Sequence, residues 1–240
     1  NAADVGISVD TGVDIAKQAA SIVLLEHSLG VVVEGVKLGR RIFANTLKYI
    51  RVTISGNFGN VFSMALASLF LTYLPLLPVQ ILVLNFLADL PALAIAGDSV
   101  DSEALEKPTS WNIKSIRRFM VIFGLISSIF DLVTFAVLQW QFHANEATFQ
   151  SGWFIESTLT ELMILIVLRT RRRFWNSRPS WALGLATIVV SALVVYIPYS
   201  LLAAPLGLVA LPFAIVATLM LLIGIYVLLN EFVKSRFDKN

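Results

Sequence analysis

The sequence predicts an all-α membrane protein, a six-helix transmembrane bundle that follows a short α/β segment at the N-terminus. Of its 240 residues, 57% are hydrophobic, and a mean hydropathy of +0.80 is too high for a soluble domain. Six apolar runs approach the roughly 20 residues that a helix needs to cross a bilayer. We place these spans near residues 51–73, 79–97, 119–141, 152–168, 181–202 and 210–229. The fourth is short and is expected to extend into its neighbours.

The positive charges predict how the spans are threaded through the membrane. All 18 Lys and Arg residues lie outside the apolar runs or at their edges. They fall before the first span, in the second and fourth loops and in the C-terminal tail, whereas the first, third and fifth loops carry none. Positive charge is retained on the cytoplasmic side, so we expect both ends of the chain to be cytoplasmic. The run Arg171–Arg173 borders a span, which favours contact with anionic lipids over nucleic-acid binding.

Residues 1–26 differ in character from the rest of the chain. Val5–Val9 predicts a short strand, Asp14–Ala20 a small helix and Ser21–Leu25 a second strand, which together form one β-α-β edge of an α/β domain. So small a unit cannot hold a core alone. The first residue is Asn rather than Met, and we expect a fragment whose α/β domain lies mostly upstream.

Residues 27–50 predict a cytoplasmic stalk helix, with apolar side chains at helical spacing among charged ones. The helix is expected to continue directly into the first span, and the transmembrane region then covers residues 51–240. A helix of roughly 45 residues would be about 65 Å long. Such a rod suits mechanical coupling between a cytoplasmic domain and the membrane centre.

Asp89 is the most informative residue within the spans. A carboxylate at the bilayer centre is costly and usually faces a polar cavity. Asn85 precedes it by one helical turn and shares its face. Pro91 is expected to break the helix and free carbonyl oxygens that can bind a cation. The alternative is a protonated, packed Asp89 beside a simple kink.

Asn57 and Asn60 lie three positions apart in the first span and also share a helix face. Both are candidate cation ligands through their amide oxygens. The alternative is interhelical hydrogen bonding, helped by the close approach that Gly56 and Gly59 allow. Packing and ligation do not exclude each other.

Three further acids lie within the spans. Glu161 and Glu156 point about 140° apart on one helix and are not expected to pair, and Asp131 lies on the third span with Ser127 one turn earlier. Counted from the inner ends, Asn60, Asp89 and Glu161 lie about 10–14 Å deep, whereas Asp131 and Glu156 lie nearer 18 Å. We therefore group Glu161 with Asp89 as a ligand and give Asp131 and Glu156 less weight.

The candidate ligands are all oxygens. The chain has no cysteine, so disulfides and thiolate metal sites are excluded, and its histidines, His27 and His143, lie outside the spans. Oxygen ligands suit a hard cation such as Mg²⁺ or Ca²⁺. No Walker loop and no DKTG-like phosphorylation sequence occurs, so any energy source lies elsewhere. A stand-alone secondary carrier or channel and a non-transporting scaffold remain alternatives.

The order of these elements resembles the C-terminal quarter of a P-type cation-transporting ATPase, over essentially the whole chain. Within that family the chain is most similar to the bacterial magnesium-importing subclass. The matching segments are Ala3–Val9 and Asp14–Lys17, which resemble the stretch after the GDGxNDxP motif, Gly39–Asn45, which resembles the stalk, and Leu77–Gln80 with Asn85 and Asp89, which resemble the sixth membrane helix. Four segments carry the likeness to the subclass: Ser55–Asn60, Phe123–Asp131, Phe149–Phe154 and Arg169–Arg172.

The resemblance implies the rest of the functional prediction. Residues 1–26 would end a phosphorylation domain of the haloacid-dehalogenase type, and the spans would be membrane helices five to ten. By position, Asn60, Asn85, Asp89 and Glu161 fall on or near cation ligands of calcium pumps. The full-length protein would be an ATP hydrolase of the bacterial inner membrane, with Mg²⁺ as transported ion and, with ATP, as cosubstrate. This fragment, without the upstream phosphorylation, nucleotide-binding and actuator domains, would be inactive alone.

In that mechanism the phosphorylation domain tilts, and the stalk pulls the first span so that the site opens to the other side. At the position of Asn60, calcium pumps have a glutamate ligand. The resemblance therefore implies one negative charge fewer in this chain, which suits a single divalent ion. A calcium or proton pump is the alternative within the family.

Overall fold

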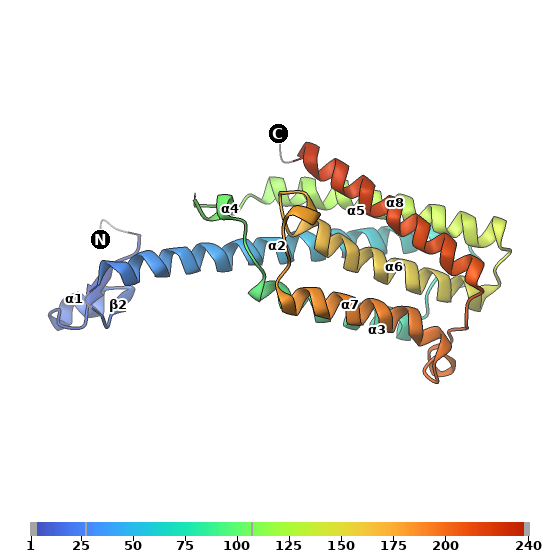
Figure 1. The fold of residues 1–240 in the computed structure, drawn as a ribbon, viewed down its shortest axis with the longest axis horizontal. Coiled ribbons are helices and arrows are strands. Elements are labelled where there is room, and N and C mark those ends of the chain that lie inside the picture. The colour runs from blue at the N-terminus through green and yellow to red at the C-terminus, as the bar shows by residue number, and fades with distance from the viewer. Residues whose placement is uncertain (1–3, 27, 107, 238–240) are drawn as a thin grey trace.

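The computed structural model describes residues 4–26, 28–106 and 108–237, and it is a helical bundle from which one long helix projects (Figure 1). This architecture confirms the predicted all-α bundle with a small α/β segment. Outside the described ranges lie Asn1, Ala3 and His27, which were used above, and Lys107 and Lys239, which belong to the 18 cations counted above.

The N-terminal segment is the predicted strand-helix-strand unit. Strand β1 (Ile7–Val9) and strand β2 (Ile22–Leu24) are joined by α1 (Asp14–Ala19) and pair in parallel, with Ile7 opposite Ile22. Both of these isoleucines are exposed. A two-stranded parallel sheet with open faces is marginal as an independent unit, and its place at the edge of a larger sheet stays a prediction.

Helix α2 (Leu29–Ala67) is the projecting helix and joins this segment to the bundle (Figure 1). The Ser28 hydroxyl caps its N-terminus by accepting a hydrogen bond of 3.1 Å from the Gly30 amide. Its 39 residues span about 58 Å. One continuous helix therefore covers the residues predicted as stalk and first span, but it ends at Ala67 and not near residue 73.

Helix α3 (Pro78–Ala94) begins with a proline at its first position, where no backbone donor is needed. The Gln80 side chain accepts a hydrogen bond of 2.8 Å from the Leu77 amide and closes this end. The predicted break at Pro91 is wrong, because α3 continues through it before tightening into a 3₁₀ turn, η1 (Ile95–Gly97). A proline removes one intrahelical hydrogen bond, and the flanking bonds hold the helix together here.

After the short helix α4 (Ser102–Glu106), helix α5 (Ile113–Ala136) ends in a π-helical turn, η2 (Val137–Gln141). The most buried element is the next helix, α6 (Glu146–Leu168). It extends six residues beyond the predicted fourth span at its N-terminus, as expected for that short run. Asn112 and Asn145 cap α5 and α6 through their side chains.

Two further long helices complete the bundle. They are α7 (Trp181–Tyr196) and α8 (Phe213–Phe237), which lie close to their predicted spans. Short 3₁₀ turns flank α7: η3 (Phe174–Asn176), η4 (Ile197–Tyr199) and η5 (Ala204–Leu206). Gly207 follows with a positive φ of 66°, where a side chain would be strained.

The helices pack in two groups around α6. Helix α2 packs mainly on α5, whereas α3 packs mainly on α7 and α6. Although a connection of only ten residues, 68–77, joins them, α2 and α3 do not form a tight hairpin, because they diverge after it. Their divergence leaves room for the cavity described below.

Among the described residues, five helical segments are long and apolar enough to cross a membrane: Pro78–Gly97, Ile113–Gln141, Glu146–Leu168, Trp181–Tyr199 and Phe213–Phe237. The second half of α2 is not among them, since it carries the polar side chains of Ser55, Asn57, Asn60 and Ser63. Its crossing of the membrane stays a prediction.

Candidate cation-binding site

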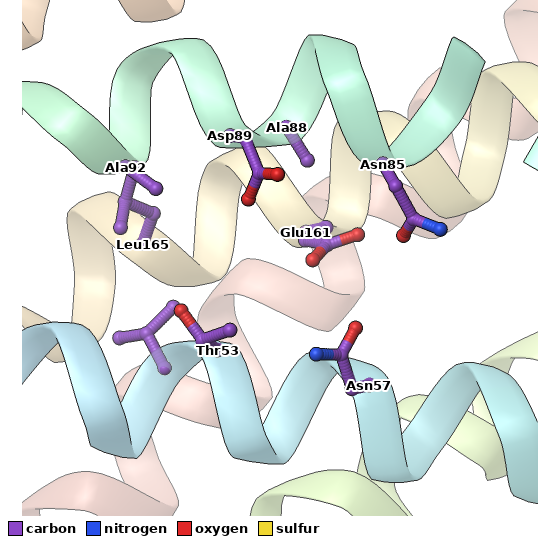
Figure 2. Close-up of a pocket in the computed structure, with 9 residues that line it drawn as sticks. Thr53, Asn57, Asn85, Ala88, Asp89, Ala92, Glu161 and Leu165 are labelled. Carbon is purple, nitrogen blue, oxygen red and sulfur yellow. The ribbon is translucent and has the colours of Figure 1, made fainter. Parts of the chain in front are cut away.

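A cavity of about 190 Å³ lies between α2, α3 and α6 (Figure 2). Four of the predicted ligands line it: Asn57, Asn85, Asp89 and Glu161. The remaining walls are built by Val52, Thr53, Ala88, Ala92 and Leu165. The structure thus gathers oxygen-bearing side chains from three helices around one space.

Helix α3 supplies Asn85 and Asp89, one turn apart, with the small Ala88 on the wall between them (Figure 2). Both polar side chains are exposed and line the cavity, so Asp89 is not the packed residue of the alternative interpretation. The reason is the divergence of α2 and α3, which opens the cavity to one side. In the part of the chain that the structure describes, neither side chain has a protein hydrogen-bond partner, and their oxygens are available to a ligand.

Helix α6 supplies Glu161, and α2 is shaped to admit it. A Cβ atom added at Gly56 would lie 3.0 Å from Oε1 of Glu161. Asn60 donates a hydrogen bond of 3.4 Å from Nδ2 to Oε2 of Glu161 and accepts one of 3.1 Å from the Ser157 hydroxyl at Oδ1. Gly56 therefore provides space for this carboxylate, and Asn60 orients it.

The two asparagines of α2 have different positions. Asn57 lines the cavity beside Asp89 and Glu161, whereas Asn60 lines a smaller neighbouring cavity of about 80 Å³. Asn57 and Asn85 border both spaces. Sequence reasoning missed Thr53, although its position one turn before Asn57 is the signal that places both on one face.

Asp131 and Glu156 do not line either cavity. Asp131 accepts hydrogen bonds from the Ser63 hydroxyl at 2.5 Å and from the Trp153 indole nitrogen at 2.8 Å. Glu156 is absent from the cavity that Glu161 lines, in keeping with the angle of about 140° that their spacing predicts. The structure separates these two acids from the candidate site.

The donor set of the cavity has a definite chemistry. Two carboxylates and two amide oxygens match the charge and hardness of a divalent ion such as Mg²⁺ or Ca²⁺. Among the described residues, no three His, Cys, Asp or Glu side chains converge on one point. The amides of Asn57 and Asn85 therefore have to complete any protein ligand set here.

A second polar cluster, which sequence reasoning missed, joins the stalk to the bundle. The buried Asp98 carboxylate accepts hydrogen bonds from Lys48 on α2 and from Arg169 after α6, both at 3.0 Å, and from the Ser180 amide before α7 at 2.9 Å. Burial lowers the pKa of Lys48, although the Asp98 charge opposes that shift. In the sequence, Asp98 resembles an ordinary loop charge after a span.

Asp101, three residues further on, has a similar setting. It accepts hydrogen bonds from the Thr170 hydroxyl at 2.5 Å and from the Ser177 hydroxyl at 2.9 Å. Burial, the largest influence, raises its pKa, but these hydrogen bonds and the charges of Arg172 and Lys48 outweigh it, so that the pKa is lowered. The connections after α3 and α6 are thereby held together.

Known proteins similar to this chain carry consistent descriptions. Residues 73–236 match the family described as cation transporting ATPase, C-terminus. The chain is 48% identical, over 99% of its length, to the magnesium-transporting ATPase, P-type 1, of Escherichia coli K12 and to that of Salmonella typhimurium LT2. It is 28% identical, over 82% of its length, to a calcium-transporting ATPase of Bacillus subtilis, of which it covers 23%. It covers 27% of the two magnesium-transporting relatives, about a quarter of their length.

Proposed function

Because this chain belongs to the family of cation-transporting ATPases, we propose that it forms the C-terminal membrane region of an ATP-driven pump that imports Mg²⁺. The relatives at 48% identity are described as magnesium-transporting, and the oxygen donors around the cavity suit that ion. ATP hydrolysis would take place in phosphorylation, nucleotide-binding and actuator domains of the same polypeptide. Mg²⁺ would also accompany ATP there as cosubstrate.

The observation that carries the proposal is the meeting of Asp89 and Glu161 at one cavity. The two carboxylates come from different helices and offset the charge of one divalent ion. Asn57 and Asn85 supply neutral oxygens, and Asn60 holds Glu161 in place. A transport site needs ligands on separate helices, because relative movement of the helices then changes the affinity for the ion.

The size of the cavity bears on the state of the ion. Magnesium dehydrates reluctantly and usually keeps several waters in protein sites. About 190 Å³ leaves room for water molecules beside the ion. We therefore propose that the four side chains hold a partly hydrated Mg²⁺ ion. A map of the loaded pump with four or more direct bonds between protein and metal would contradict this.

The stalk gives the proposal a mechanical route. Helix α2 runs without interruption from the strand-helix-strand segment to Asn57. Movement of a cytoplasmic domain against the membrane would therefore shift Asn57 relative to α3. Such a shift would open or close the ligand set around Asp89 and Glu161.

The setting in the membrane follows from the charges. We propose a multi-pass protein of the bacterial inner membrane, with both ends of this chain on the cytoplasmic side. The basic run Arg171–Arg173 would lie at the cytoplasmic surface and contact anionic lipid headgroups there.

Magnesium uptake by the full-length protein tests the proposal. Bacteria that lack their own Mg²⁺ uptake systems would express the wild type, Asp89→Asn and Asp14→Asn, an acid-to-amide control on the exposed helix α1. We expect the wild type and the control to restore growth and Mg²⁺ accumulation at limiting Mg²⁺, and Asp89→Asn to restore neither. The site assignment would be overturned if Asp89→Asn transported as well as the wild type.

Transport by the same proteins in vesicles tests the identity of the ion independently of the assignment as an ATP-driven pump. The relative at 28% identity is described as calcium-transporting, and carboxylate oxygens also suit Ca²⁺. ATP-driven movement of Ca²⁺ or H⁺ without Mg²⁺ would leave the pump assignment in place and reject magnesium. Ion movement without ATP would instead indicate a secondary carrier.

A further inference from the structure

A buried pair of acids, Asp131 on α5 and Glu156 on α6, lies inside the bundle and apart from the cation cavity. Each residue is only 1% exposed. Both oxygens of Asp131 have donors, the Ser63 hydroxyl of α2 at 2.5 Å and the Trp153 indole nitrogen at 2.8 Å. These two hydrogen bonds favour the charged carboxylate of Asp131 over its protonated form.

Glu156 has a different environment. Its carboxyl group lies within hydrogen-bonding reach of the Asp131 carboxyl. Its Oε2 atom is buried, and it has no hydrogen-bond partner among the described residues. Within the described part of the chain, neither acid takes part in an ion pair. Two ionised carboxylates in contact and shielded from water would repel each other strongly. A hydrogen bond between two carboxyl groups also requires a proton on one of them.

We propose that Asp131 and Glu156 form a proton-binding site that holds one proton, carried by Glu156 and shared with Asp131 through a hydrogen bond. The pair then has a single negative charge, and the donors Ser63 and Trp153 stabilise it on Asp131. The site is separate from the cavity of Asp89 and does not depend on which cation the pump transports.

The same contacts argue against a metal ion at this place. The hydroxyl of Ser63 and the indole N–H of Trp153 point their hydrogens at the oxygens of Asp131. A cation that used those oxygens would have to displace both donors, and the indole N–H cannot act as a ligand. A proton on Glu156 leaves both hydrogen bonds in place.

Other titratable groups near the pair add no positive charge. Tyr226 on α8 is affected by the charges of both acids, and Glu161 on α6 by the charge of Asp131, so both groups lie near the pair. Each is neutral or negative, and a negative neighbour favours retention of the proton. Helix α2 contributes Ser63, whose hydroxyl carries no charge. None of these groups brings a positive charge that would stabilise a second ionised carboxylate beside Asp131.

Infrared spectroscopy of the full-length pump in lipid nanodiscs tests this directly. A protonated carboxyl group has a C=O band that shifts in D₂O, and an ionised one lacks it. We expect the wild type to show such a band at pH 8, where an exposed Glu with a pKa near 4.3 is ionised. Glu156→Gln is expected to lose the band, and Glu146→Gln, a control at the exposed start of α6, to keep it.

Asp131→Asn distinguishes the contribution of Glu156 to the band from that of Asp131. Glu156 would stay buried without a carboxylate neighbour, so its protonated band is expected to remain at a different frequency. If Glu156→Gln fails to fold, the uncharged double variant Asp131→Asn/Glu156→Gln replaces it and is expected to lack the band. Spectra that are identical for the wild type and for whichever of these variants folds would overturn the proposal.

Stability against pH gives a second, independent readout. The folded pump holds one more proton at this pair than the unfolded chain at neutral pH, so its stability falls as pH rises. The unfolding equilibrium constant of the wild type, relative to the double variant, should increase about tenfold per pH unit between pH 6 and 8. A pH-independent ratio would show that both acids are ionised in the fold, contrary to the proposal.

Discussion

Asp98 offers the sharpest test of how the stalk is fastened to the bundle. Its carboxylate accepts hydrogen bonds from Lys48, Arg169 and the Ser180 amide. The Asp98 and Arg169 side chains are fully buried, and that of Lys48 is 13% exposed. Asp98→Asn removes the negative charge that lies between Lys48 and Arg169 and leaves these two cations beside a neutral amide.

The size of the effect follows from the burial of Arg169. Removal of one partner from a buried ion pair costs about 3–5 kcal/mol, because the other charge is left uncompensated. Arg169 also donates to the carbonyl and hydroxyl oxygens of Ser177, so its hydrogen bonds are not all lost. We therefore expect a loss near the lower limit, about 3 kcal/mol.

The assay is reversible unfolding of the full-length protein in mixed micelles, followed by tryptophan fluorescence. A double-mutant cycle compares the wild type with Asp98→Asn, Arg169→Gln and the double variant that carries both substitutions. The double variant should be more stable than the sum of the single losses predicts, because it contains no uncompensated Arg169. Glu103→Gln, which removes an exposed partner of Arg172, is the surface control and should change little. Strictly additive losses, or a loss for Asp98→Asn no larger than for Glu103→Gln, would refute this reasoning.

Three further predictions concern packing and pH. Gly124→Ala would place a Cβ atom 2.5 Å from Cδ1 of Phe58, so this variant should have a lower melting temperature than the wild type. The control Gly224→Ala would place a Cβ atom with nothing within 4 Å, so it should raise the melting temperature through better helix propensity. Gly56→Ala would place a methyl group 3.0 Å from a Glu161 oxygen and should weaken Mg²⁺ activation of ATP hydrolysis without loss of folded protein. In the fold, the pKa of Asp101 is lowered below its usual value of 3.8. The ionised Asp101 therefore stabilises the fold fully above pH 3.8, and this stabilisation is lost as pH falls through the lower pKa of the folded state. The melting temperatures of the wild type and Asp101→Asn should converge only below about pH 4.

The fold could be predicted from the sequence because its main signals are local. Apolar runs and clustered cations mark the spans, and Pro78 marks the start of α3. The end of α2 at Ala67 carries no such signal, since the apolar residues Leu69, Phe70 and Leu71 follow it. The divergence of α2 and α3 was also beyond prediction, because it depends on the packing of α3 against α7.

The candidate site could be predicted in part. One helical turn between Asn85 and Asp89, together with the estimated depth of Glu161, grouped three residues that the structure places at one cavity. Depth alone could not show that Asn60 turns toward Ser157. The sequence also could not show how Asp131 differs in role from Asp89, since both are acids within apolar helices. The difference lies in partners from other helices, which sequence spacing does not reveal.

Helix α2 takes part in all three polar sites, through Lys48 at Asp98, Asn57 at the cavity and Ser63 at Asp131. Along one helix these residues lie about 13 Å and about 9 Å apart. An axial shift of α2 by one residue, about 1.5 Å, would stretch the contacts of Lys48 and Ser63 beyond hydrogen-bonding distance. Sideways movement is opposed where Gly59 packs closely on α5. A pull on the stalk that moves Asn57 must therefore also disturb the buried acid pair, unless α2 bends between them. The proton that we propose at this pair would then respond to the same motion that we propose to open the candidate cation site.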